Sequence, residues 1–98
     1  MALVVDDSPS MRKLVSQTLR SVGYEICEAG NGIEAMVQVT VASRIDLVIA
    51  DVNMPVMDGI KLVGQLRKTA STLIVPILML TTVTESRDKE RAKLAGAN

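Results

Sequence analysis

Four short apolar runs, separated by segments with helical spacing, constrain the fold of this chain more than any other feature. Residues 47–50 are apolar at every position, which is expected of a strand buried on both faces of a parallel sheet. The expected strands are residues 2–5, 24–29, 46–51 and 75–80. Strands that alternate with helices predict an α/β fold, an open and doubly wound parallel sheet with right-handed crossovers.

The first intervening segment has clear helix signals. Ser8-Pro9 predicts a helix start, with Ser8 as N-cap and Pro9 at the first helical position, and Gly23 stands where a C-cap glycine is common. We expect its apolar stripe to face the core; the stripe comprises Met11, Leu14, Val15, Leu19 and Val22.

The second segment fits two patterns. A helical stripe is formed by Ile33, Met36, Val37, Thr40 and Val41. Residues 37–41 also alternate as a strand does, but residues 34–36 favour a helix and parallel strands need a crossover, so we expect a helix. A third helix is expected from Ile60, and a last, highly charged one over residues 86–95.

Composition bounds the function. The chain of 98 residues is expected to be one domain over residues 1–98, and its eleven basic and eleven acidic residues argue against a nucleic-acid-binding face. No stretch approaches the roughly 20 apolar residues of a membrane span, and no signal peptide is recognisable, so a cytoplasmic protein is expected. The chain has no histidine and one cysteine, Cys27. Its chemistry must therefore use carboxylates, hydroxyls and lysines.

Polar residues follow three of the expected strands. Asp6 and Asp7 come after the first, Asp51 ends the third, and Thr81 follows the fourth. Ligands of open parallel sheets bind at this carboxyl edge, and three carboxylates converge there if the first and third strands are neighbours. Taken singly, Asp7 is as easily a capping residue and Thr81 an ordinary strand end. Their coincidence at one edge is what indicates a site.

Three carboxylates in one crevice repel one another or bind a cation. An all-oxygen site without histidine or cysteine suits a hard divalent ion, most plausibly Mg²⁺. A carboxylate beside such an ion can act as a nucleophile toward a phosphoryl group and form an aspartyl-phosphate. The hydroxyl of Thr81 would then hydrogen-bond a phosphoryl oxygen.

Four motifs resemble those of the CheY-like receiver domains of response regulators, in register along the whole chain. They are Val4-Val5-Asp6-Asp7-Ser8, Asp51-Val52-Asn53-Met54-Pro55 with Asp58-Gly59, residues 76–81, and Ala95-Gly96-Ala97. The resemblance implies a flavodoxin-like sheet of strand order 2-1-3-4-5. Residues 8–12 and Thr81-Thr82 further resemble stand-alone chemotaxis receivers.

The resemblance also implies roles for individual residues. Asp51 matches the phosphoacceptor, Asp7 the direct Mg²⁺ ligand, and Asp6 its partner, often through water. Asn53 matches the residue whose backbone carbonyl completes the metal shell, and Thr81 the hydroxyl residue that moves toward the phosphoryl group. The implied phosphodonor is a phosphohistidine on a sensor histidine kinase, and the implied output is altered binding of a downstream protein partner.

Two family features lie beyond this chain. Family members carry a fifth strand with a lysine, and a fifth helix, whereas the sequence ends at Asn98 with four strand–helix units. We therefore expect a C-terminally incomplete receiver domain whose fourth strand is an exposed edge. Such an edge pairs with other chains, so a homodimer by sheet-edge pairing or segment exchange is one expectation.

Two other functions compete with a phosphorylation-controlled switch. A receiver-like interaction module that works without phosphorylation is favoured by the missing lysine but opposed by the intact acidic residues and Thr81. A phosphatase of the haloacid-dehalogenase kind needs Asp-x-Asp, and the chain has Asp51-Val52-Asn53. We expect a switch that catalyses only its own phosphoryl transfer and dephosphorylation, not a multiple-turnover enzyme.

Overall fold

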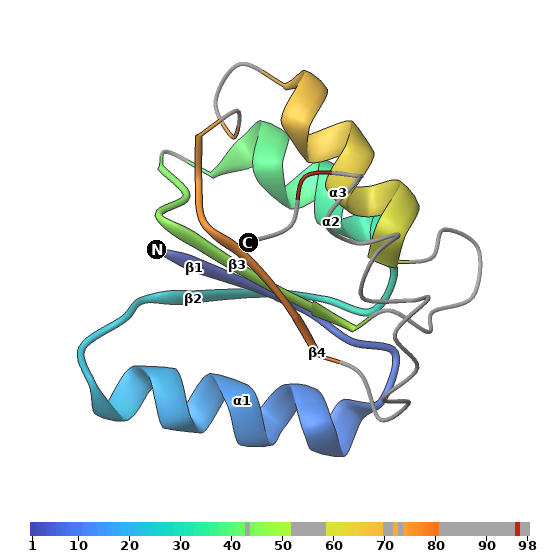
Figure 1. Ribbon diagram of the computed structural model, residues 1–98. Helices are drawn as coiled ribbons and strands as arrows, with labels where there is room; N and C mark the ends of the chain where they lie inside the picture. Colours follow the sequence, from blue (N-terminus) through green and yellow to red (C-terminus); the bar gives the residue numbers. More distant parts are fainter. Residues whose placement is uncertain (43, 52–58, 70–71, 73, 81–95, 97–98) are drawn as a thin grey trace.

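A computed structural model describes residues 1–42, 44–51, 59–69, 72, 74–80 and 96 of the chain. Strands and helices alternate along these residues (Figure 1). The elements are β1 (Ala2–Val5), α1 (Pro9–Ser21), β2 (Ile26–Ala29), α2 (Gly32–Val41), β3 (Leu47–Asp51), α3 (Gly59–Lys68) and β4 (Ile77–Leu80). The alternation expected from the sequence is confirmed through β4, and the predicted last helix lies outside the described residues.

The strands form one parallel sheet with the order β2-β1-β3-β4. Helix α1 covers one face, and α2 and α3 cover the other (Figure 1). The doubly wound α/β architecture is therefore confirmed, and the order agrees with the flavodoxin-like order that the resemblance implied.

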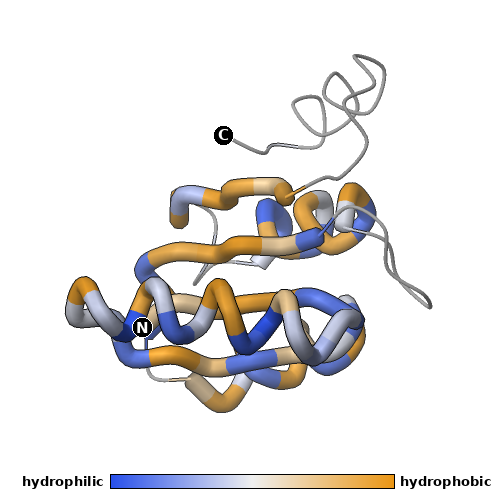
Figure 2. Tube along the Cα trace, turned by 90° about the horizontal axis from the view of Figure 1, so that it is seen from below, coloured by the Kyte–Doolittle hydropathy of each residue, from blue (hydrophilic) through white to orange (hydrophobic). Residues whose placement is uncertain are grey.

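The main core lies between the sheet and the α2–α3 layer. Alternate residues of β1 and β3 point into it, and the apolar positions of these strands stand out along the trace in Figure 2. Its fully buried members include Leu3, Val48, Leu62, Val63, Leu66 and Ile77. Burying an aliphatic side chain of this size stabilises the fold by about 1.5–3 kcal/mol.

Strand β3 begins one residue later than predicted, and two other strands begin two residues later, for identifiable reasons. The amide of Tyr24 donates to the carbonyl of Leu19 at 3.1 Å, so Tyr24 still belongs to the exit of α1, and β2 starts at Ile26. The amide of Val75 donates back to Thr72 at 3.3 Å, and Pro76 has no amide hydrogen to give to a ladder, so β4 starts at Ile77.

The buried faces of two helices differ from the predicted stripes. In α1, Val15 and Leu19 are half-buried, but Met11, Leu14 and Val22 are exposed, because no second described helix packs beside α1 on that face. In α2 the helix is confirmed, but its buried face runs through Ala35 and Val39. Of the predicted stripe, Met36 is half-buried and packs against the core, whereas Ile33, Val37 and Val41 are exposed.

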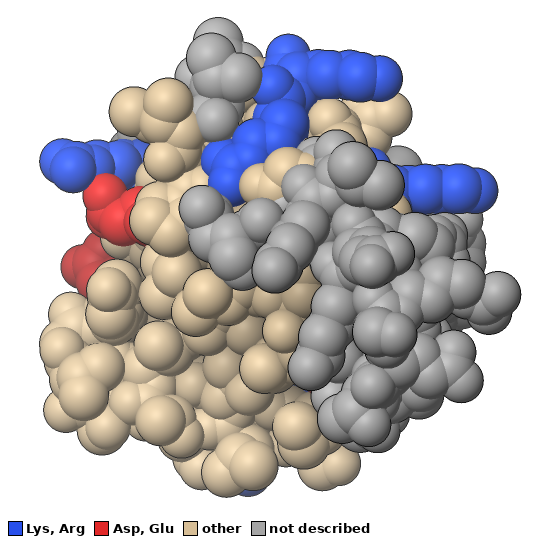
Figure 3. Space-filling model, in the orientation of Figure 1, with Lys and Arg blue, Asp and Glu red and all other residues tan. Residues whose placement is uncertain are grey.

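Charged side chains are unevenly spread over the described surface. On the face shown in Figure 3, basic side chains gather in the upper part, where α3 with Lys61, Arg67 and Lys68 lies. Much of the rest of the described surface on this face is uncharged. No helix in the described part of the chain has the length and apolar character needed to cross a membrane.

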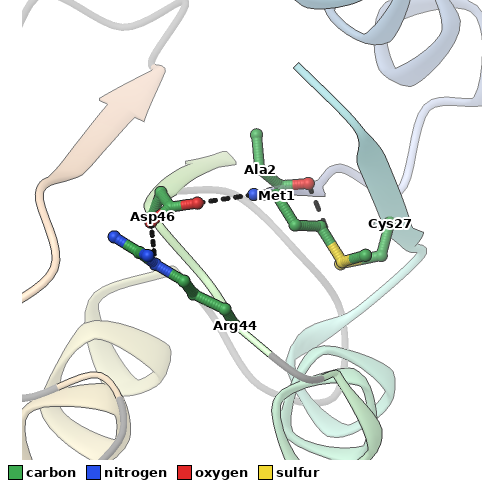
Figure 4. A network of polar contacts seen from close by, with 5 residues as sticks. All are labelled: Met1, Ala2, Cys27, Arg44 and Asp46. Atoms are coloured by element: carbon green, nitrogen blue, oxygen red, sulfur yellow. Dashed lines mark hydrogen bonds and ion pairs between the residues drawn. The ribbon is translucent and has the colours of Figure 1, made fainter.

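The amino end of the sheet carries a compact polar network (Figure 4). The Met1 amino group donates to Asp46 Oδ2 at 2.7 Å, and Arg44 Nε donates to Asp46 Oδ1 at 2.6 Å. The hydrogen bond from Met1, with the nearby Arg44, lowers the pKa of Asp46. Beside it, Cys27 Sγ lies 3.8 Å from the carbonyl oxygen of Ala2, and burial raises the pKa of this thiol.

Candidate functional site

Three carboxylates gather at the carboxyl end of the sheet. One oxygen each of Asp6, Asp7 and Asp51 can be chosen so that all lie within 4.8 Å of one another. Asp6 is buried, Asp51 half-buried and Asp7 exposed, so the cluster reaches from the interior to solvent. The predicted convergence is confirmed. Asn53 and Thr81, which were expected to complete the site, lie outside the described residues.

The sheet register produces this convergence. Strand β1 pairs with β3 so that Val5 lies opposite Ala50, and the next residues along each strand are Asp6 and Asp51. On its other side Val5 lies opposite Ala29, and the amide of Asp6 donates to the carbonyl of Ala29 at 3.1 Å. Asp6 therefore leaves the sheet from a position held by both neighbouring strands.

The turn from β1 into α1 is closed by side chain–backbone bonds. The amide of Ser8 donates to Asp6 Oδ1 at 2.8 Å, and Ser8 Oγ accepts from the amide of Met11 at 3.4 Å. Ser8 is the N-cap and Pro9 the first helical residue, as predicted. Because the cap is Ser8, the capping interpretation of Asp7 does not apply to this helix.

Arg12 is a contributor to the site region that the sequence interpretation missed. Its Nη1 donates to the backbone carbonyl of Asp6 at 2.6 Å, and its Nε lies 3.6 Å from Glu28 Oε1 on β2. The sequence feature that could have indicated this contact is a basic residue near the start of the helix that follows Asp6 and Asp7. Its long side chain is expected to lean back toward the start of that helix.

Gly59 has a structural role that was predicted only as turn chemistry. It is the first residue of α3, and a Cβ atom there would overlap the backbone carbonyl oxygen of Asp51 and lie 2.6 Å from Met79 Cε. The absence of a side chain therefore lets α3 begin directly against the end of β3.

The donor set of the cluster suits a hard cation. It offers carboxylate oxygens only, from the loop after β1 and from the end of β3, and like charges at this separation favour a bound cation. Its partial exposure leaves a route to solvent through Asp7.

Comparison with known proteins agrees with this geometry. The model of the family described as "Response regulator receiver domain" matches residues 2–98. The chain belongs to this family. The predicted two-component receiver is thus confirmed at the level of family and fold.

Similar proteins include stand-alone and multidomain members. A structure of the chemotaxis protein CheY4 of Vibrio cholerae is 45% identical with a TM-score of 0.93, and the match covers 99% of this chain and 80% of that one. Chemotaxis protein CheY1 of Helicobacter pylori is 38% identical over 97 residues, which are 98% of this chain and 78% of CheY1.

Sensor histidine kinase RcsC of Escherichia coli (strain K12) is 38% identical over 96 residues. The matched segment covers 98% of the present chain but only 10% of the length of RcsC.

Proposed function

We propose that the receiver domain accepts a phosphoryl group on Asp51 in a Mg²⁺-dependent reaction and thereby switches its binding to a protein partner. The observation that carries the proposal is the juxtaposition of Asp51 with Asp6 and Asp7, within 4.8 Å, at the carboxyl edge of a parallel sheet. Ligand and phosphate sites of open α/β folds lie at this edge.

Asp6 and Asp7 are the residues that would hold the ion, together with Asp51. A bound Mg²⁺ would neutralise charge on the phosphoryl oxygens during transfer. The Asn53 carbonyl as a further ligand and the Thr81 hydroxyl as a phosphoryl partner remain predictions.

Asp51 would act as the nucleophile. One carboxylate oxygen forms a bond to phosphorus while the phosphorus–nitrogen bond of a phosphohistidine donor breaks, and the electron pair of that bond stays on the imidazole nitrogen. Gly59 assists by letting α3 abut the carbonyl of Asp51, which fixes the residue that carries the nucleophile. The product is an aspartyl-phosphate, and its hydrolysis by water resets the domain.

The proposed phosphodonor is a sensor histidine kinase. This inference is supported by the relative RcsC, a sensor histidine kinase that contains a segment like this chain. A donor of this kind implies the cytoplasmic location expected from the sequence. A downstream protein would respond to the switch, provided that it binds the two states with different affinity.

Intact mass after incubation with acetyl phosphate and Mg²⁺ tests the proposal. We expect one added phosphoryl group on the wild-type chain, no gain with EDTA, and no gain for Asp51→Asn. Asp46→Asn is the matched control, because it removes a carboxylate at the opposite end of β3 and should still gain the group.

A folded wild-type chain that gains no mass would contradict the proposal and favour an interaction module that works without phosphorylation. A gain that persists in Asp51→Asn would place the phosphoryl group elsewhere.

Self-association through β4 is a separate prediction. Strand β4 is an edge of the described sheet, and Leu78 on it is exposed. Edge strands of this kind pair with other chains. Sedimentation that finds only a folded monomer at high concentration would contradict a homodimer formed by sheet-edge pairing or segment exchange.

A further inference from the structure

We infer that Arg12 is a positioning residue that sets the spacing of the Asp6 and Asp7 carboxylates for a divalent cation. The inference rests on the proposed function, since it concerns the same acidic cluster. It assigns Arg12 no contact with the ion or the phosphoryl group.

The bond from Arg12 acts on the peptide unit between the two carboxylates. Nη1 donates to the carbonyl oxygen of Asp6 at 2.6 Å, and that carbonyl belongs to the unit that joins Asp6 to Asp7. A peptide unit is planar, so a bond that restrains the direction of its carbonyl also restrains how the two flanking Cα atoms are oriented. Arg12 therefore controls how the exposed Asp7 is presented beside the buried Asp6.

Other bonds hold Asp6 but leave Asp7 to this contact. The Asp6 amide is bound to Ala29 at 3.1 Å and its carboxylate accepts from the Ser8 amide at 2.8 Å. Among the described residues, the bond from Arg12 to the Asp6 carbonyl is the contact from outside the turn that restrains the peptide unit preceding Asp7. A charge-assisted bond of this kind is stronger than one between neutral groups.

The guanidinium is itself anchored on a second strand. Its Nε lies 3.6 Å from Glu28 Oε1, and Glu28 lies opposite Val4 in the pairing of β1 with β2. The Arg12 side chain is only 24% exposed. A planar guanidinium serves a carbonyl and a carboxylate at once, in a geometry that the single ammonium group of lysine does not reproduce.

If Arg12 positions the carboxylates, its replacement should weaken Mg²⁺ binding. If Arg12 acts only through its positive charge, its replacement should strengthen Mg²⁺ binding. Arg12 places a positive charge near the cluster, so loss of that charge alone should strengthen cation binding. Loss of positioning should weaken it, because partners that orient metal ligands typically contribute about 10–100-fold in metal affinity.

The test is an NMR titration with Mg²⁺ alone, without phosphodonor, followed at the amides of Asp6, Asp7 and Asp51. Arg12→Lys keeps the positive charge but replaces the planar guanidinium by a single ammonium group. Arg12→Gln removes both the charge and the guanidinium. Lys13→Gln is the matched control, since it removes one charge from an exposed neighbour on the same helix. The dispersion of the remaining amide signals shows that each variant is folded.

We expect about tenfold weaker Mg²⁺ binding in both Arg12 variants and a shifted Asp7 amide in the metal-free state. Lys13→Gln should bind Mg²⁺ as tightly as the wild type, or slightly more tightly. The inference is overturned if Arg12→Lys binds like the wild type, if Arg12→Gln binds more tightly, or if the Asp7 amide does not move.

The outcomes separate this inference from the proposed function. A wild-type chain that gains no phosphoryl group but binds Mg²⁺ in an Arg12-dependent way would refute phosphorylation and leave the positioning role intact. A chain that is phosphorylated normally, with Mg²⁺ affinity independent of Arg12, would refute the positioning role alone.

Discussion

Just before β3, the carboxylate of Asp46 lies between two cations of the chain, whereas at the far end of the same strand Asp51 lies with two more carboxylates. The Met1 amino group and Arg44 approach Asp46 at 2.7 and 2.6 Å (Figure 4). At the carboxyl end, Arg12 donates to a backbone carbonyl of the cluster rather than to a carboxylate.

The difference indicates what each end is built for. At the amino end the negative charge of Asp46 is balanced by the Met1 amino group and Arg44. At the carboxyl end, three like charges are held together by sheet register and turn bonds, an arrangement that a divalent cation would stabilise. Acidic residues at the two ends of one strand therefore serve structure at one end and, we propose, chemistry at the other.

The strongest test of this contrast disrupts the carboxyl end alone. In Gly59→Ala, the new Cβ meets the Asp51 backbone, which cannot move aside as a side-chain tip would. We expect a loss of about 3 kcal/mol in unfolding free energy, the upper part of the usual range for overpacking, together with loss of Mg²⁺ binding. Urea unfolding followed by circular dichroism measures the first effect.

Gly64→Ala is the control for that substitution. Gly64 lies within α3, and its Cβ would meet no atom within 4 Å. Helix propensity then predicts a gain of up to about 1 kcal/mol. If both variants lose stability equally, the close approach of Gly59 to Asp51 is not the cause.

A smaller effect is the stabilisation of the folded chain by bound Mg²⁺, which should depend on the acidic cluster and not on Asp46. A cation that binds only the folded chain adds about 1.4 kcal/mol to the unfolding free energy when its free concentration is ten times its Kd. We expect Mg²⁺ to stabilise the wild type and Asp46→Asn in this way, and Asp7→Asn hardly at all. Without Mg²⁺, Asp7→Asn should be slightly more stable than the wild type, because one repelling charge is gone. Equal Mg²⁺ stabilisation of all three chains would contradict the assignment of the cluster.

The smallest effect concerns acid stability at the amino end. The pKa of Asp46 is lowered in the folded chain by its bond from the Met1 amino group and by Arg44. A lowered folded pKa adds stability above the unfolded pKa of about 3.9, and that stability is lost as the pH falls through the folded pKa.

Unfolding free energies of the wild type and Asp46→Asn should therefore differ slightly at neutral pH and converge in acid. Because Asp46 is partly exposed, raised salt should reduce the neutral-pH difference. A difference that grows toward low pH would have the wrong sign for this explanation.

Much of the fold followed from local sequence. The continuous apolar run of β3 and the Ser8-Pro9 start of α1 are signals carried by a few adjacent residues, and the structure confirms both predictions. The starts of β2 and β4 were placed too early because the amides of Tyr24 and Val75 bond backward to earlier residues. Which side of α2 is buried depends on the packing of its neighbours, so the helical stripe through Val37 predicts the helix but not its buried face.

The site was predictable only in part, for a similar reason. Asp6, Asp7 and Asp51 were found because each follows an apolar strand, and a parallel sheet brings such ends together. The reach of Arg12 to the Asp6 carbonyl and the close approach of Gly59 to Asp51 depend on how α1 and α3 sit against the sheet. No local pattern encodes these distances.

The pairing of Val5 with Ala50 has a consequence for how such sequences change over time. Deleting or inserting one residue within β1 or β3 would turn buried side chains toward the opposite face and also separate Asp6 from Asp51. Single-residue length changes in these strands would thus disrupt the packing of the core and the acidic cluster together. Length variation is expected to accumulate instead in connections such as the one between α1 and β2, which contributes no residue to the acidic cluster.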